Sequence, residues 1–118
     1  MNSIIQWNCR GLKINLVEIS LLIQAFLPVA FCLQETHLKE DDTVNVKNYS
    51  LYTTRVRKDE RAAGGSSILV INNIIHSQIS LKTNLQAVAV RISLQKPLHC
   101  VLFMSHPMQQ SIFEILSH

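Results

Sequence analysis

Residues 3–37, SIIQWNCRGLKINLVEISLLIQAFLPVAFCLQETH, contain the pattern that decides the fold. Two apolar runs, SIIQW at residues 3–7 and VAFCL at residues 29–33, have the length and composition of buried strands. Between them, apolar residues return every three or four positions, which is the spacing of one helix face: Leu16, Ile19, Leu22, Ile23 and Phe26. The stretch therefore predicts a strand, a helix and a second strand.

The ends of the helix have their own signals. Asn15 stands where an N-cap is expected, and Glu18 lies three residues later, as in a capping box. Pro28 cannot continue a helix, so it predicts the helix end.

A helix that connects two strands of one sheet makes those strands parallel, so that both carboxyl ends reach the same edge of the sheet. Asn8 follows the first apolar run and Glu35 closely follows the second. We therefore expect these two side chains to be neighbours. Functional sites of open α/β sheets lie outside this edge, so we expect the chemistry of the protein there.

In the rest of the chain the sequence predicts mainly strands. In residues 86–94 apolar and other side chains alternate, and we expect Val88, Val90, Ile92 and Leu94 to share one face. Further strands are expected at residues 49–54, 67–71, 74–81 and 99–104, and a helix is expected to start within residues 110–116. The order of elements predicts an α/β fold with a mixed sheet.

Length and composition limit the fold to a single domain. The chain has 118 residues, of which 47% are hydrophobic and 16% are charged, so it can form a core and is not a disordered tail. Eleven basic against eight acidic residues give a net charge of +3. This excess fits a polyanionic partner without requiring one.

Cysteine usage and hydropathy indicate an intracellular protein, in the nucleus or cytoplasm. Cys9, Cys32 and Cys100 are odd in number and far apart, which does not suggest a disulfide framework. The longest apolar stretch, residues 19–33, includes Gln24 and Pro28 and is shorter than the roughly 20 residues that cross a bilayer. We expect no membrane association.

Glu35 and Asn8 are the leading candidates for chemistry. A carboxylate at the end of a buried strand is costly unless it binds a donor or a cation, and Mg²⁺ prefers such an oxygen. Each residue also has a structural interpretation, Glu35 as a loop cap and Asn8 as a turn residue.

The charged segments allow two interpretations. Contact with nucleic-acid phosphates is one role for the basic residues Arg10, Arg55, Arg57, Lys58 and Arg61. Asp59 and Glu60 dilute this run, so a solvated loop is the alternative. No acidic residue of these loops follows a buried strand, and we expect exposed side chains at Glu40, Asp41, Asp42, Asp59 and Glu60.

Several motifs together resemble the endonuclease/exonuclease/phosphatase family, and most closely the endonuclease domain of non-LTR retrotransposons of the jockey or LINE type. The motifs are IIQWNCRGL at residues 4–12 and FCLQETHL at residues 31–38, followed in order by NYSLY, GGSSILVIN, LQAVAVRISL and HCVLFMSHP. The resemblance implies a four-layer α/β sandwich and places Asn8 and Glu35 in the active site, with Glu35 as a Mg²⁺ ligand. It also implies metal-assisted hydrolysis of a DNA phosphodiester, in which the nick primes reverse transcription.

The sequence departs from the family in two respects. Phe103 stands where the family has a tyrosine that contacts phosphate, and an Asp-x-Asn element and a terminal Asp-His pair of the second half are not present. We therefore expect residues 1–118 to be a partial domain that binds Mg²⁺ weakly and is inactive alone. The alternative is a non-catalytic retrotransposon relic or a weak nucleic-acid-binding fragment. A half domain would also leave the face of Val88, Val90, Ile92 and Leu94 uncovered, so self-association is expected.

Overall fold

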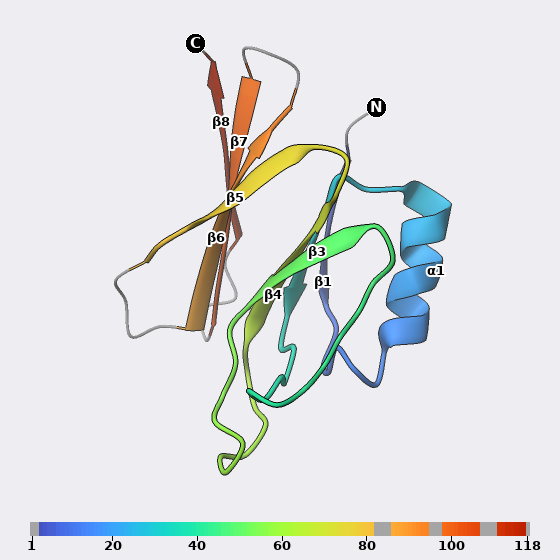
Figure 1. Cartoon of the computed structure of the whole chain (residues 1–118), viewed down its shortest axis with the longest axis vertical. Coiled ribbons are helices and arrows are strands. Elements are labelled where there is room, and N and C mark those ends of the chain that lie inside the picture. Colours follow the sequence, from blue (N-terminus) through green and yellow to red (C-terminus); the bar gives the residue numbers. More distant parts are fainter. Residues whose placement is uncertain (1–2, 82–85, 95–97, 107–110, 118) are drawn as a thin grey trace.

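The computed structural model of the chain describes residues 3–81, 86–94, 98–106 and 111–117 (Figure 1). These residues form one helix and eight strands. In chain order the elements are β1 (Ile4–Asn8), α1 (Leu16–Phe26), β2 (Ala30–Gln34), β3 (Tyr49–Thr53), β4 (Ser66–Ile71), β5 (Ile75–Ile79), β6 (Gln86–Ser93), β7 (Leu98–His106) and β8 (Ser111–Ser117).

The strands form two four-stranded sheets. The first has the order β1-β2-β4-β3, in which β1 and β2 are parallel and the pairs β2–β4 and β3–β4 are antiparallel. The second has the order β5-β6-β7-β8 and is antiparallel throughout. The predicted strand, helix and parallel strand are confirmed, and so are the mixed sheet and the α/β class.

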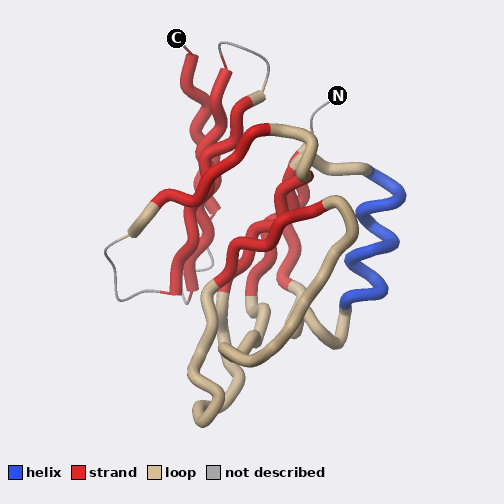
Figure 2. The backbone as a smooth tube through the Cα atoms, in the orientation of Figure 1, coloured by secondary structure: helices blue, strands red, loops and turns tan. Residues whose placement is uncertain are grey.

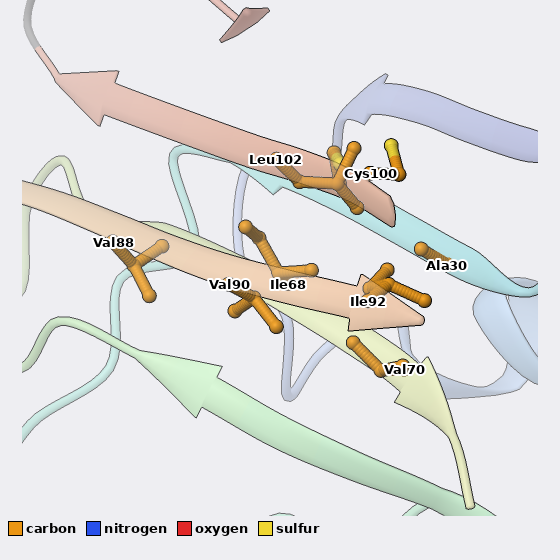
Figure 3. Packing of buried hydrophobic residues seen from close by; sticks show 9 residues of the cluster. Ala30, Ile68, Val70, Val88, Val90, Ile92, Cys100 and Leu102 are labelled. Atoms are coloured by element: carbon orange, nitrogen blue, oxygen red, sulfur yellow. The ribbon is translucent and has the colours of Figure 1, made fainter. Parts of the chain in front are cut away.

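Two apolar layers hold the elements together. Figure 2 shows α1 on one side of the first sheet and the second sheet on the other. Ile19 and Ile23 of α1 are buried against Phe31, Leu33 and Leu69 of the first sheet. On the opposite face, alternate residues of β2 and β4 pack against alternate residues of β6 and β7 (Figure 3). The layer between the sheets comprises Ala30, Cys32, Ile68, Val70, Val88, Val90, Ile92, Cys100 and Leu102.

This packing overturns the expectation of an uncovered sheet face. Val88, Val90 and Ile92 are at most 1% exposed, because the chain supplies both sheets of the sandwich and the first sheet covers them. This face is therefore not available for self-association.

The expected helix within residues 110–116 is also wrong. These residues lie largely in β8, which pairs antiparallel with β7 and places Ile112 opposite Phe103. A short apolar run does not distinguish a helix from a strand by its spacing, and backbone pairing with β7 decides the outcome here.

Asn15 does not form the predicted capping box. Its side chain makes no cap hydrogen bond to the helix, and its Nδ2 instead donates to the carbonyls of Cys9 (2.6 Å) and Gly11 (3.0 Å). The carboxamide thus fastens the loop that follows β1. The helix ends at Phe26, before Pro28, and Leu27 adopts a left-handed conformation as its C-cap.

In the part of the chain that the structure describes, no helix is long and apolar enough to cross a membrane.

The layer between the sheets gives a prediction about stability. Ile68 is fully buried there, so Ile68→Ala should lower the free energy of unfolding by about 2–5 kcal/mol through lost burial and the cavity left behind. Val17→Ala is the control, because Val17 on α1 is 74% exposed and its truncation should have little effect. Denaturant unfolding measures both, and equal losses would contradict the packing described here.

Candidate active site

The parallel pairing of β1 with β2 continues past the ends of the strands. Asn8 and Gln34 are the last residues in register. Beyond them, the Cys9 N–H donates to the Gln34 carbonyl (3.1 Å) and the Gly11 N–H to the Glu35 carbonyl (2.7 Å). These bonds hold the two polar segments, NCRG and QETH, side by side at the carboxyl edge of the sheet.

Asn8 and Glu35 touch one another at this edge. The Asn8 Nδ2 donates a hydrogen bond to Oε2 of Glu35, which confirms that the two residues are neighbours despite the 27 positions between them. The other end of the Asn8 carboxamide, Oδ1, is buried and has no hydrogen-bond partner within the described part of the chain. The site therefore presents an oriented carboxylate beside an unsatisfied amide oxygen.

The backbone around this pair is strained. Arg10, Glu35 and His37 have φ angles of 50°, 53° and 56°, in the left-handed region that residues with a Cβ rarely adopt. Each such conformation costs roughly 1–2 kcal/mol. The surrounding hydrogen bonds hold Glu35 in this conformation, and such strain is typical of functional sites.

Four buried polar side chains lie at the same end of the first sheet. They are Gln34 and Thr36 at the end of β2 and Ser66 and Ser67 at the start of the antiparallel β4. Sequence reasoning missed them as a group. A usable signal was the glutamine in the last position of the otherwise apolar strand AFCLQ.

The second sheet reaches this polar end through β6. The Gly65 N–H donates to Oε1 of Gln86 (2.7 Å), and the Ser66 hydroxyl donates to the Gln86 carbonyl (3.2 Å). Gly65 has a φ of +97°, and a Cβ there would lie 2.7 Å from Oγ1 of Thr36. A side chain at this position would therefore be strained and would crowd the end of β2.

Two of the predicted nucleic-acid contacts are engaged within the chain. The Arg55 guanidinium donates to the carbonyls of Lys39 (2.9 Å) and Asp42 (2.7 Å), which ties the loop after β3 to the loop after β2. Arg57 forms an exposed ion pair with Asp59 at 3.0 Å. Arg55 thus has a structural role.

The remaining predicted contacts, Arg10, Lys58 and Arg61, have exposed side chains, and their role in binding nucleic acid stays a prediction.

The acidic loop residues are exposed as expected, except for one. Asp42 is half-buried, with its side chain 19% exposed, because it forms an ion pair with Lys13 at 3.0 Å. The backbone N–H of Lys39 and the Lys13 ammonium hold the pKa of Asp42 below its usual range. The exposed members of the set are Glu40, Asp41, Asp59 and Glu60.

Phe103 lies in β7, where it is in register with Ala89 and Ile112. Its side chain is outside the described part of the structure, so its predicted position at the phosphate is not tested.

The donor set at the edge suits a hard cation. A carboxylate oxygen and an unsatisfied amide oxygen are the ligands that Mg²⁺ prefers. In the described ranges, this edge included, no three histidine, cysteine, aspartate or glutamate side chains gather as a metal-binding cluster. Glu35 and Asn8 could therefore hold a cation with most of its coordination positions left for water or phosphate oxygens.

Cys9 adjoins the pair but is not suited to nucleophilic attack. It is 2% exposed, and its Sγ lies 3.4 Å from the Gln34 carbonyl. Burial raises the pKa of Cys9 to about 11 and that of Cys32 to about 12, so both remain thiols near neutral pH.

The solved structures that this structure resembles include three nucleases. The endonuclease domain of TRAS1, a telomere-specific non-LTR retrotransposon, matches 89% of this chain with a TM-score of 0.68 and 17% identity. A 3′-5′ exonuclease from Neisseria meningitidis matches 83% with a TM-score of 0.56 and 14% identity. An AP endonuclease from Leishmania major matches 99% with a TM-score of 0.54 and 18% identity.

The chain has the endonuclease/exonuclease/phosphatase fold. The likeness lies in the structure, since no family model and no curated protein matches the sequence. The chain spans 45%, 39% and 40% of the three neighbours, which is less than half of each. It therefore supplies a part of this fold, with the edge of Asn8 and Glu35 included.

The left-handed backbone at Glu35 gives a prediction that distinguishes the effect of backbone strain on stability from the effect of losing the carboxylate charge. Glu35→Ala and Glu35→Gly both remove the carboxylate, but only glycine adopts a φ of 53° without steric cost. We expect the glycine variant to be more stable than the alanine variant by about 1 kcal/mol. Denaturant unfolding measures the difference, and an alanine variant of equal or higher stability would show that residue 35 is not left-handed.

A second prediction concerns the thiols. With a pKa of about 11 instead of 9.0, Cys9 in the native protein should have a thiolate fraction about 100-fold below that of an ordinary cysteine at pH 8. A disulfide reagent such as DTNB should therefore modify it slowly, and Cys32 more slowly still. The same protein unfolded in urea is the control, and rapid modification of Cys9 in the native state would overturn its buried placement.

Proposed function

We propose that this chain carries part of the active site of a Mg²⁺-dependent DNA endonuclease, with Glu35 as a metal ligand and Asn8 as its partner. The observation that carries the proposal is the contact between the Glu35 carboxylate and the Asn8 carboxamide at the carboxyl edge of two parallel strands. The three structural neighbours described above, each a nuclease, support it.

Each group has a distinct part in this site. Glu35 offers a charged oxygen and Asn8 offers Oδ1, while the Nδ2 of Asn8 fixes the direction of the carboxylate. The Gly11 N–H holds the Glu35 backbone. When bound, Mg²⁺ supplies positive charge that stabilises the phosphoryl oxygens during hydrolysis by water. The chain's own residues thus position oxygen ligands where a phosphodiester would be held.

We further propose that the substrate is the DNA target of a non-LTR retrotransposon, where a nick exposes a 3′-hydroxyl for reverse transcription. The TRAS1 endonuclease domain, with its TM-score of 0.68, supports this part of the proposal.

Hydrolysis needs groups that activate water in addition to a metal ligand. In the described residues, the edge offers one carboxylate and one amide oxygen, so we propose that the complete site draws further groups from elsewhere. The second candidate function is a nucleic-acid-binding module without catalysis, which the exposed Arg10, Lys58 and Arg61 favour.

Metal binding tests the proposal directly. Titration with Mn²⁺, a paramagnetic substitute for Mg²⁺, should broaden the NMR signals of the Asn8 side-chain amide and of residues 34–36. Glu35→Gln removes the charged ligand and should weaken this binding at least about tenfold. Glu40→Gln is the matched control, because Glu40 is an exposed carboxylate that accepts a hydrogen bond from the Lys58 N–H, and its loss should leave the titration unchanged.

Two outcomes would contradict the proposal. Equal broadening in wild type and Glu35→Gln would mean that Glu35 is not a ligand. Broadening confined to residues 40–42 would place the cation on the acidic loop. Relaxation of supercoiled plasmid by the 118 residues alone, lost in Glu35→Gln, would support the endonuclease and overturn the expectation that further groups are needed.

A further inference from the structure

We propose that Gln34 is a phosphate-binding residue of this site, whose side-chain NH₂ donates a hydrogen bond to a non-bridging oxygen of the nucleic-acid backbone. The inference rests on the proposed function and adds to it the group that holds the anionic substrate beside the cation ligands.

The position of Gln34 follows from the strand that carries it. Successive side chains of a strand alternate between faces, and Ala30 and Cys32 of β2 lie in the layer between the two sheets. Gln34 has the same parity, so its side chain belongs to the face that looks toward the second sheet. Ser66 lies opposite Gln34 in register and bonds to β6, which indicates the same direction.

Gln34 stands in a polar row at the end of this layer. Asn8 is its register partner on β1, and Ser66 is its register partner on β4. The apolar layer between the sheets therefore gives way to polar side chains at the same edge where Asn8 contacts Glu35.

The carboxamide of Gln34 has an unmet donor. The residue is 6% exposed, and its Nε2 has no hydrogen-bond partner among the described residues. The Ser66 hydroxyl donates to the Gln86 carbonyl and accepts no hydrogen bond from Gln34 Nε2. A buried donor without a partner is destabilising, so its retention at this edge points to a ligand acceptor.

The chemistry of the neighbouring groups selects that ligand. Asn8 Oδ1 and the Glu35 carboxylate are acceptors that suit a cation, whereas an N–H donor cannot bind one. A donor beside a cation site suits an anionic oxygen that the cation also attracts. The phosphodiester of nucleic acid presents such an oxygen, and hydrogen bonds to charged acceptors are stronger than neutral ones.

The test uses the whole chain and a short DNA duplex in the presence of Mg²⁺. In the wild-type protein, addition of the duplex should shift the NMR signals of the Gln34 side-chain NH₂. Gln34→Glu replaces the donor by a charged acceptor and should weaken duplex binding about tenfold or more, while Mg²⁺ binding is retained or strengthened. Gln78→Glu, which adds the same charge at an exposed position of β5, should change neither affinity.

The outcomes separate this inference from the proposed function. If the wild type binds the duplex in a Mg²⁺-dependent way but the Gln34 NH₂ signals do not move, the role of Gln34 is overturned and the proposed function stands. If Gln34→Glu and Gln78→Glu weaken binding equally, the effect is one of overall charge and the inference also fails. If the wild type binds neither Mg²⁺ nor the duplex, both proposals fall. The NMR shift needs no variant, so an unstable Gln34→Glu protein still leaves the inference decidable.

Discussion

The parallel pairing of β1 with β2 is the constraint on which the rest of the structure depends. It requires the crossover through α1, and it brings two chain segments that are 27 residues apart to one edge in fixed register. The backbone bonds from Cys9 and Gly11 to the segment after β2 extend this register beyond the sheet. This backbone register brings Asn8 and Glu35 close enough for their side chains to form a hydrogen bond.

The second sheet packs on the first, so that this edge lies at the end of a two-sheet sandwich. Between the sheets, alternate side chains are apolar and fully buried as far as Ile68 and Cys32, and the next positions outward are Ser66 and Gln34. Apolar burial stabilises the sandwich over most of its length. At its end the same backbone carries polar groups into a buried environment, where they are costly unless a partner satisfies them.

Sequence periodicity predicted the elements that depend on local pattern, including β1, α1 and β2, and from these the proximity of Asn8 and Glu35. It failed where the structure of a segment depends on contacts with residues far away in the sequence. The cover over Val88 depends on a sheet formed by other segments, and the strand at residues 111–117 depends on pairing with β7. The Asn15 side chain donates hydrogen bonds to loop carbonyls and does not cap the helix. The glutamine that ends the apolar strand AFCLQ signals a polar group at this edge, but the sequence does not show that its Nε2 is buried without a partner.

Three features of the edge share one energetic character. The left-handed backbone of Glu35, the unsatisfied Oδ1 of Asn8 and the unsatisfied Nε2 of Gln34 each oppose folding. The apolar layers on both faces of the first sheet are large enough to tolerate this cost. An unsatisfied oxygen acceptor and an unsatisfied nitrogen donor on two residues paired in register are complementary to a cation and an anion bound together. In the proposed site, a cation held at Asn8 Oδ1 and a phosphodiester oxygen held at Gln34 Nε2 would together satisfy both groups.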